Sequence, residues 1–380
     1  MAGTIVLLIL ACLAAVYLGY PLLILALAAG RRVPPPPAEG APPASVSIIV
    51  CAHNEAASIG AKLRSVGAAV AGRADAEILV VDDGSTDATA QIVAELAQTV
   101  PLRLMRLPRG GKAAALRQAI AVASGEILVF SDADPLWEAG TLDALLAPFA
   151  DPGVGAVAGE VRSLRASAAS RWRAGDALFR AYESAIRAAE DRLFGCVSAD
   201  GGLFALRAAL AEPVPPDVTD DFYLSTAAVV RGYRIAFRPD AAVYEVSPPG
   251  VRQHLRRRIR ITVRGLTGLW RRRQLLNPLR TGAYGVALLF HKLLRRLAPL
   301  LLLPLWAALL WLALDAGGVT AAALFLGATL SGLLLLVLPL PLPKWVRLPL
   351  YVAVHLFGLA AGTLLFLAGR RYTQWAPQKP

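Results

Sequence analysis

Residues 46–130 alternate short apolar runs with helix-like stretches, and this alternation constrains the fold more than any other feature of the chain. The apolar runs lie at residues 46–52, 77–83, 102–107 and 127–130. A short apolar run without polar alternation predicts a strand that is buried on both faces. Strands that alternate with helices predict βαβ units, so we expect an α/β fold with a parallel sheet.

Polar and acidic side chains follow three of these strands where each strand ends. They are His53, Asn54, Glu55, Asp82, Asp83, Asp132 and Asp134. In an open parallel sheet the ligand lies beyond the carboxyl ends of the strands, at a switch point in the strand order. The sequence therefore predicts that these side chains gather around one ligand.

Asp132 and Asp134 stand two residues apart where the fourth strand opens into a loop, so their side chains point the same way. Two like charges so placed repel unless a divalent cation or strong donors lie between them. Mg²⁺ suits such a pair, because substrate phosphates complete its coordination. The alternative is a helix start at Asp134-Pro135, with the aspartates as caps.

The other two acidic stretches also allow two interpretations. Asp82 and Asp83 could accept hydrogen bonds from a base or a ribose, or they could belong to a turn in which Ser85 or Thr86 caps the next helix. Asp220 and Asp221 suggest a general base whose pKa is raised by its neighbour. The alternative is a helix N-terminus with Thr219 or Asp220 as the cap.

Residues 109–112, read as RGGK, precede a predicted helix. The glycines there would free backbone N–H groups, and Lys112 would add a point charge for a diphosphate. The spacing of a Walker loop is absent. An ordinary loop before a helix is the alternative.

The ends of the chain are apolar, which predicts a membrane protein. Residues 4–29 carry no charge, enough to cross about 30 Å of hydrocarbon. Arg31 and Arg32 follow at once and place the downstream side in the cytoplasm. Three further apolar segments lie near residues 299–314, 319–339 and 348–369. Because Arg370 and Arg371 follow the last one, either one of these segments does not cross or residues 283–297 belong to a span.

The chain has a formal net charge of +12, from 39 Lys and Arg against 27 Asp and Glu. Beside membrane spans, this excess indicates contact with anionic lipid at the cytoplasmic face. No nucleic-acid recognition motif accompanies it, so we expect no nucleic-acid partner. The arginine-rich residues 251–276 predict an amphipathic helix at the membrane surface, with one or two arginines left to contact a diphosphate.

Taken in order, these stretches resemble the family 2 glycosyltransferases of the GT-A fold, in their membrane-anchored bacterial polysaccharide-synthase-like branch. The resemblance runs from about Val46 to Pro299. It rests on SIIVCAHNE (47–55), VVDDGSTD (80–87), GGKAAALRQAI (110–120), DAD (132–134), SADGGLFALR (198–207), VTDDF (218–222) and HKLLRRLAP (291–299).

The resemblance implies a function for several of these residues. Asp82 or Asp83 would meet the uracil and ribose of a UDP-sugar, with Lys112 nearby. Asp134, helped by Asp132, would hold Mg²⁺ or Mn²⁺ on the diphosphate. Asp221 would deprotonate the acceptor hydroxyl, with Asp220 in the position of a family glutamate.

The processive members of this family carry Q-x-x-R-W after the base, and this chain departs from that motif. Gln253 and Arg256 fit one register without the tryptophan, whereas Arg257 and Arg260 fit another. The missing tryptophan places polymer synthesis in doubt, but not sugar transfer.

We therefore expect a GT-A domain between transmembrane helices. The expected segments are a transmembrane helix (1–30), a Pro-rich linker (31–44), a cytoplasmic catalytic domain (45–250), basic interfacial helices (251–297), about three transmembrane helices (298–370) and a tail (371–380). The expected activity is inverting sugar transfer to a glycan or lipid-linked acceptor at the cytoplasmic membrane. The alternatives are single-sugar transfer to polyprenyl phosphate and a non-catalytic membrane scaffold with a sugar-nucleotide fold.

Overall fold

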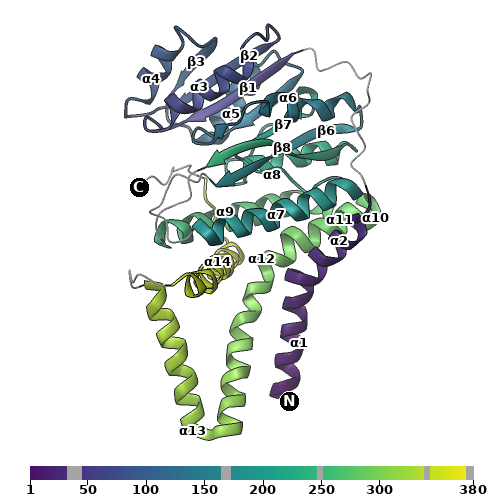
Figure 1. Ribbon diagram of the computed structural model, residues 1–380, viewed down its shortest axis with the longest axis vertical. Helices are drawn as coiled ribbons and strands as arrows, with labels where there is room; N and C mark the ends of the chain where they lie inside the picture. Colours follow the sequence, from purple (N-terminus) through teal and green to yellow (C-terminus); the bar gives the residue numbers. More distant parts are fainter. Residues whose placement is uncertain (32–44, 164–172, 246–250, 338–342, 374–380) are drawn as a thin grey trace.

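The structure is a computed structural model of the whole chain, and it describes residues 1–31, 45–163, 173–245, 251–337 and 343–373. The predicted Pro-rich linker after Arg31 and the end of the predicted tail lie outside these ranges. The described residues form three layers (Figure 1). A sheet with its covering helices lies uppermost, long helices cross beneath it, and apolar helices extend away from it.

The first half of the sheet is parallel, as the sequence predicts. Its order is β3-β2-β1-β4, with all three pairings parallel. The strands are β1 (Val46–Ala52), β2 (Ala76–Asp83), β3 (Leu102–Leu107) and β4 (Ile127–Ser131). The connecting helices are α3 (Ile59–Val70), α4 (Thr89–Leu96) and α5 (Lys112–Val122). Because the chain passes from the edge strand β3 to the far side of β1, a switch point lies between β1 and β4.

The second half of the sheet is mixed. It continues from β4 in the order β7-β6-β8-β5, with parallel pairing between β6 and β8 and antiparallel pairing elsewhere. The strands are β5 (Leu136–Trp137), β6 (Val154–Ser163), β7 (Phe204–Arg207) and β8 (Arg234–Glu245), and the helices are α6 (Thr141–Leu146) and α8 (Asp220–Val230). The interpretation of Asp134-Pro135 as a helix start is wrong, because β5 follows at once and pairs with β8.

Alternating residues of β1 bury into two cores, one on each face of the sheet. Ile48 and Val50 pack with Leu63 of α3, whereas Ile49 packs with Leu116 of α5. All seven residues of β1 are buried, as the uninterrupted apolar run predicts. The sheet is therefore a rigid support for the loops at its carboxyl edge.

A layer of helices lies between the sheet and the apolar helices (Figure 1). It contains α2 (Tyr20–Ala28), α7 (Arg173–Leu193), α9 (Val251–Arg271), α10 (Pro278–Thr281), α11 (Ala283–Leu288) and α12 (Arg295–Leu297). A third core joins α2, α7, α9 and α11 to Val197 and Phe222 of the sheet domain. The N-terminal helix is thus packed against the same unit as the sheet.

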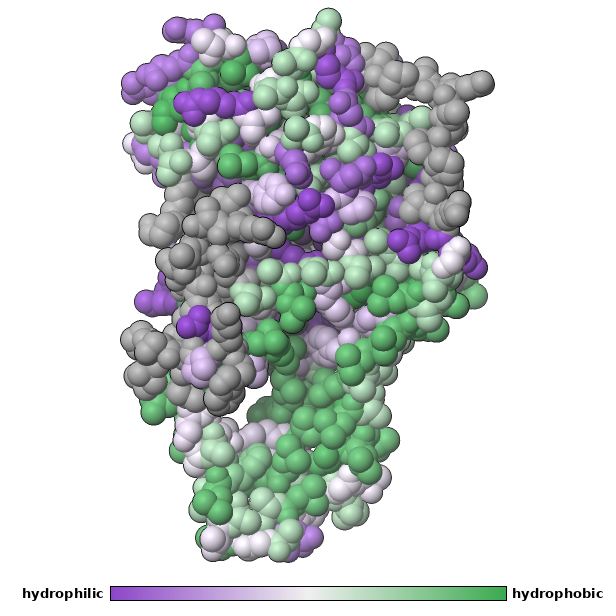
Figure 2. Space-filling view, viewed as in Figure 1, coloured by the Kyte–Doolittle hydropathy of each residue, from purple (hydrophilic) through white to green (hydrophobic). Residues whose placement is uncertain are grey.

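Within the described ranges, three helical stretches are long and apolar enough to cross a membrane: Ala2–Ala28, Ala283–Gly332 and Val346–Leu367. The first contains α1 (Ala2–Ala14), a π-helical stretch (Ala15–Gly19) and α2. The second includes most of α13 (Leu302–Val337), which breaks at Gly318 (φ +60°) and forms a hairpin (Figure 1). Apolar side chains cover the surface of α1 and the hairpin (Figure 2).

The last described helix, α14 (Lys344–Leu367), lies beneath the sheet domain against α9 and α7 (Figure 1). Gly362 of α14 packs against Thr262 of α9 so closely that a β-carbon would lie 2.6 Å from the threonine. Residues 283–297 run directly into α13. Val346–Leu367 of α14 is itself long and apolar enough to cross a membrane, so the number of spans stays a prediction.

Candidate active site

A fully buried lysine holds the loop that carries Asp132 and Asp134. Lys62 Nζ donates to Ser131 Oγ (2.5 Å) and to the Pro135 carbonyl (2.8 Å), one on each side of the two aspartates. Trp137 Nε1 donates to the same serine oxygen at 3.2 Å. Burial lowers the pKa of Lys62 to about 7. Sequence analysis missed this residue, because nothing in α3 distinguishes it from a surface lysine.

Replacing Lys62 with methionine should weaken catalysis through the position of this loop. The change leaves the Pro135 carbonyl without its Lys62 donor and Ser131 Oγ with Trp137 as its remaining donor, at a cost of about 1–3 kcal/mol. We expect kcat/KM to fall roughly 10- to 100-fold, with weaker activation by Mn²⁺. Steady-state kinetics against Mn²⁺ concentration measures this. A variant with an unchanged melting temperature and unchanged Mn²⁺ activation would exclude the positioning role.

The Asp83 carboxylate holds the loop before α5. It accepts hydrogen bonds from the backbone N–H of Gly110 (2.7 Å) and of Gly111 (2.9 Å) and pairs with Arg109. Gly84 is left-handed (φ +64°), and a β-carbon there would lie 2.7 Å from the Arg109 nitrogen. The side chain of Asp83 is thus enclosed by donors of the chain itself. The predicted contact with the nucleotide stays a prediction for Asp83.

The residues that follow β1 form hydrogen bonds to the loop that follows β2. Asn54 is left-handed (φ +54°), its N–H donates to Ser85 Oγ (2.9 Å), and its Oδ1 accepts from the Thr86 N–H (2.8 Å). His53 Nδ1 lies 2.9 Å from the Asp83 carbonyl oxygen. Ser85 and Thr86 therefore bind the loop after β1 and do not cap α4, as one interpretation of the sequence had it. At the start of α4, Asp87 Oδ1 accepts a hydrogen bond from the Thr89 N–H at 3.0 Å.

Lys112 joins two of the acidic clusters at the first residue of α5. Its Nζ lies 2.6 Å from Asp132 Oδ1 and 2.7 Å from Asp220 Oδ2. Burial alone would lower the pKa of Lys112, but these two carboxylates raise it well above its usual value. Since Asp83 holds the loop that ends in Lys112, all three acidic stretches of the sequence meet here.

Asp221 faces the same space and forms no ion pair with a residue of the described ranges. Asp221 Oδ2 and Asp132 Oδ2 lie 3.8 Å and 3.4 Å from the β-carbon position of Gly201, so a side chain there would meet both. Thr219 precedes α8 and makes no side-chain cap. Arg264 of α9 donates to the Val218 carbonyl (2.8 Å) and fixes the start of α8.

The two neighbouring carboxylates of α8 differ in acidity. Burial raises the pKa of Asp221 to about 6, and the charges of Asp220 and Asp200 contribute. Burial opposes ionisation of Asp220 too, but Lys112 lowers the pKa of that carboxyl below its usual value. Asp221 is therefore the member of the pair that can accept a proton near neutral pH.

These side chains line one cavity of about 680 Å³ beneath the carboxyl edge of the sheet. Of the predicted site residues, those on its wall are Glu55, Lys112, Asp132, Asp134, Asp220, Asp221, Arg257 and Arg260. His53, Asn54, Asp82 and Asp83 lie behind that wall and shape the loops. Asp82 is buried, and its Oδ1 accepts from the Ser85 N–H at 3.3 Å.

Four arginines of α9 line the cavity: Arg257, Arg258, Arg260 and Arg264. Arg257 and Arg260 are those of the second predicted register, and Gln253 of the first register lines the cavity as well. Arg257 pairs with Glu245 at 2.6 Å, and Arg260 lines the wall. Arg256, which belongs to the first register, is exposed and lies outside the cavity wall. Glu245 also pairs with Arg180 at 2.8 Å. Sequence analysis missed Glu245, which lies at the end of β8 far from any motif.

Asp134 is the carboxylate best suited to hold a metal ion. Its side chain is accessible in the cavity and makes no hydrogen bond or ion pair with any described residue. Enclosure in the cavity, with the charges of Glu245 and Asp132, raises its pKa to about 7. No group of three ligating side chains occurs among the described residues. The donor set therefore fits a cation that takes further ligands from substrate phosphates and water.

The protonation of Asp134 should make metal activation depend on pH. Below pH 7 the carboxyl binds a proton that the metal must displace, so the metal's affinity falls as pH falls. We expect the Mn²⁺ concentration for half-maximal activity to rise about tenfold per pH unit well below 7 and to level off above it. A value that stays constant between about pH 5.5 and pH 8 would contradict this assignment.

A half-parallel sheet with acidic loops at its switch point is the architecture of a GT-A glycosyltransferase, and comparison with known proteins agrees. Residues 47–210 match the model of the glycosyl transferase family 2. This stretch of the chain is therefore similar to the family 2 glycosyltransferases, and its sheet has a GT-A-like fold. The match ends before α8, so the assignments of Asp220 and Asp221 rest on their geometry.

Similar proteins include a mannosyltransferase, PcManGT of Pyrobaculum calidifontis, whose structure contains GDP-Man and Mn²⁺. It is 28% identical, with a TM-score of 0.74, and the similarity covers 96% of this chain and 99% of that one. An N-acetylglucosaminyltransferase of Rhizobium meliloti is 28% identical over 61% of this chain, and a poly-β-1,6-N-acetyl-D-glucosamine synthase of Staphylococcus aureus is 28% identical over 45%. The chain spans 58% and 43% of the lengths of these two relatives.

Proposed function

We propose that this chain is a metal-dependent, inverting glycosyltransferase that moves a sugar from a nucleotide sugar to an acceptor hydroxyl at a membrane. The observation that carries the proposal is the position of Lys112 Nζ, within 2.7 Å of both Asp132 and Asp220. This bridge joins the loop that would bind the donor to the helix that bears the base. Sugar transfer needs the bound donor and the base next to each other in one site.

The transfer is a single displacement at the anomeric carbon. The bond between that carbon and the β-phosphate oxygen breaks, and its electron pair leaves with the nucleoside diphosphate. A bond to the acceptor oxygen forms on the opposite face, which inverts the configuration. Asp221 takes the hydroxyl proton, for which its pKa of about 6 is suited.

The leaving diphosphate needs positive charge, which several groups of this cavity can supply. A divalent ion held by Asp134, and by Asp132 as predicted, would neutralise charge on the diphosphate oxygens. Lys112, Arg257 and Arg260 line the same cavity. We keep UDP-sugars as the expected donors and add GDP-Man, because PcManGT was solved with it.

We place α1 and the α13 hairpin across the cytoplasmic membrane, with α2 in the helical layer beneath the sheet and the catalytic domain facing the cytoplasm. Leu303, Leu324 and Leu330 expose their side chains on the hairpin, as lipid-facing residues do. The layer of α7, α9 and α14 would then lie at the bilayer surface. The relatives that make N-acetylglucosamine polymers suggest a place in cell-envelope or exopolysaccharide synthesis.

Release of nucleoside diphosphate from a panel of UDP- and GDP-sugars, with the full chain in detergent, tests the proposal. We expect release from at least one donor with Mn²⁺ or Mg²⁺ and none with excess chelator. A chain that folds, binds the nucleotide sugars and releases no diphosphate from any would favour the non-catalytic scaffold. The product's size then separates polymer synthesis from single-sugar transfer.

A further inference from the structure

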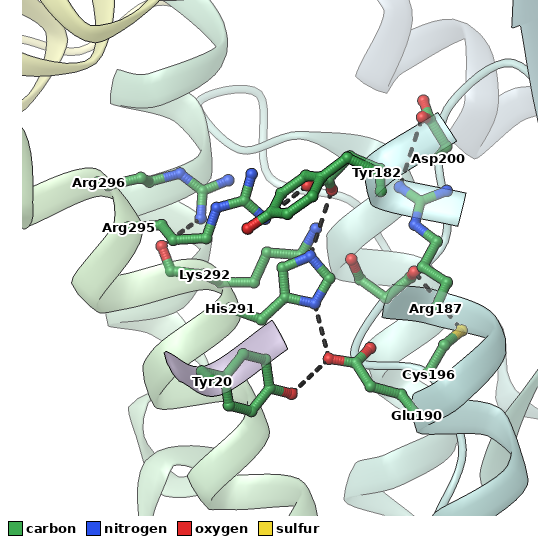
Figure 3. A network of polar contacts seen from close by, with 12 residues as sticks. Tyr20, Tyr182, Arg187, Glu190, Cys196, Asp200, His291, Lys292, Arg295 and Arg296 are labelled. Atoms are coloured by element: carbon green, nitrogen blue, oxygen red, sulfur yellow. Dashed lines mark hydrogen bonds and ion pairs between the residues drawn. The ribbon is translucent and has the colours of Figure 1, made fainter. Parts of the chain in front are cut away.

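The cavity that holds the aspartates continues away from the sheet and ends among cationic side chains at the base of α13. This cationic end is formed by Arg187 of α7, Arg258 of α9, and Lys292, Arg295 and Arg296 of the segment that leads into α13. Figure 3 shows Lys292, Arg295 and Arg296 projecting from that segment toward Tyr182 and Arg187 of α7. The cavity therefore has an acidic end and a basic end.

The carboxylates near the basic end are already engaged. Glu183 accepts from Arg295 (2.5 Å) and lies 3.2 Å from His291 Nε2. Glu190 lies 2.7 Å from His291 Nδ1 and accepts from Tyr20 at 2.6 Å (Figure 3). Arg187 is 3.4 Å from Asp200. These contacts leave two cations of the segment without a carboxylate partner.

The two are Lys292 and Arg296. The ammonium group of Lys292 has no hydrogen bond or ion pair with a described residue, and Arg296 donates to the Lys292 carbonyl at 2.9 Å. Enclosed cations without an ion-pair partner among the described residues are costly, so a site that keeps them calls for an anion from outside the chain.

The helices around the basic end make room for these long side chains. A β-carbon at Gly265 of α9 would lie 2.8 Å from Arg296 Nη2, and one at Gly358 of α14 would lie 2.8 Å from Arg258 Cγ. Thr363 of α14 also donates to the Arg296 carbonyl at 2.7 Å. The arginines are thus seated in the packing of α9 and α14, which is a built site and not a solvated face.

We propose that Lys292 and Arg296 bind the phosphate or diphosphate that links a lipid to the acceptor sugar. The inference rests on the proposed function and names the acceptor of the same cavity. Arg296 and Asp221 line the same cavity, so a phosphate at Arg296 would place the sugar on the side of the base. The donor's diphosphate belongs at the other end, near Asp134. The apolar hairpin begins at Leu302, one short 3₁₀ turn after the helix that carries Arg296, which suits a lipid tail.

The test compares two acceptors with the full chain in nanodiscs of zwitterionic phosphatidylcholine. One is a monosaccharide on a short isoprenyl diphosphate, and the other is the neutral isoprenyl glycoside of the same sugar. We expect Lys292→Gln and Arg296→Gln each to raise KM for the diphosphate acceptor roughly 10- to 100-fold. KM for the neutral acceptor and for the donor should stay unchanged, and Arg296→Lys should recover part of the loss.

Arg280→Gln is the matched control, because Arg280 is an exposed arginine of the same helical layer outside the cavity wall. It should leave both KM values unchanged. Equal losses for both acceptors, or no loss for either, would overturn the proposal. A dependence on bulk lipid would also overturn the proposal. In that case the wild-type rate would depend on added anionic phosphatidylglycerol and the variants would lose this dependence, because the cations would bind lipid headgroups.

If the chain turns over no donor, the proposed function is wrong, but the anion site at Lys292 and Arg296 can still be tested. Binding of geranyl diphosphate, measured by fluorescence or calorimetry without metal, then supplies the readout. The acceptor site predicts binding by the wild type and by Arg280→Gln, with a roughly 10- to 100-fold loss in Arg296→Gln. Equal binding by all three proteins would contradict it.

Discussion

Asp221→Asn should lower the transfer rate by roughly three orders of magnitude while the protein still folds and binds its donor. The amide cannot accept the hydroxyl proton, and general-base catalysis contributes about 10²- to 10⁴-fold. The loss should appear in kcat, because the donor side of the cavity is unchanged. Single-turnover measurements with saturating donor separate this step from product release.

The pH profile of the wild-type rate shows whether the base acts in its ionised form. Asp221 is active only when ionised, so kcat should rise with pH through about 6 and then level off. Asp220→Asn removes one of the charges that raise the pKa of Asp221, so its acid limb should move to lower pH. If Asp221→Asn keeps near-wild-type rates, the base lies elsewhere.

Asp134→Asn should abolish activation by Mn²⁺ or Mg²⁺. The asparagine keeps the shape of the side chain but loses the charge, and a metal ion supplies several kcal/mol of transition-state stabilisation. We expect kcat/KM to fall by about a thousandfold and to become insensitive to chelator. Isothermal titration of Mn²⁺ in the presence of nucleoside diphosphate measures the same loss in binding.

Asp143→Asn provides a matched control for this change. Asp143 is an exposed aspartate of α6 that pairs with Arg73 at 2.6 Å and lies outside the cavity. Its substitution should leave metal activation unchanged. Normal Mn²⁺ dependence in Asp134→Asn would mean that the metal, if used, is held by other groups.

The parallel half of the sheet could be predicted because its strands are buried on both faces. The apolar run from Val46 to Ala52 leaves no choice of exposed face, and the predicted boundaries of β1 and β3 match the structure. The mixed half could not be predicted in this way. The partner of β5 is β8, which lies about a hundred residues later in the chain, and no local pattern specifies that pairing.

The gathering of the acidic stretches followed from the topology, but their partners did not. Asp83 at the end of β2 accepts hydrogen bonds from Gly110 and Gly111, which follow β3. Lys62 of α3 donates to Ser131, which lies 69 positions later in the chain. Such contacts depend on the depth and direction of side chains in the folded domain. Sequence spacing gives neither, which is why Lys62 and Glu245 were missed.

The central claim is that the acidic stretches form one site for a metal-bound nucleotide sugar, with the base beside its anomeric carbon. A structure of the full chain with Mn²⁺ and a non-transferable nucleotide sugar tests it most directly. The claim predicts anomalous density for Mn²⁺ between Asp134 and the diphosphate, with the sugar between this metal and Asp221. A nucleotide bound outside the cavity, or a metal far from Asp134, would contradict it.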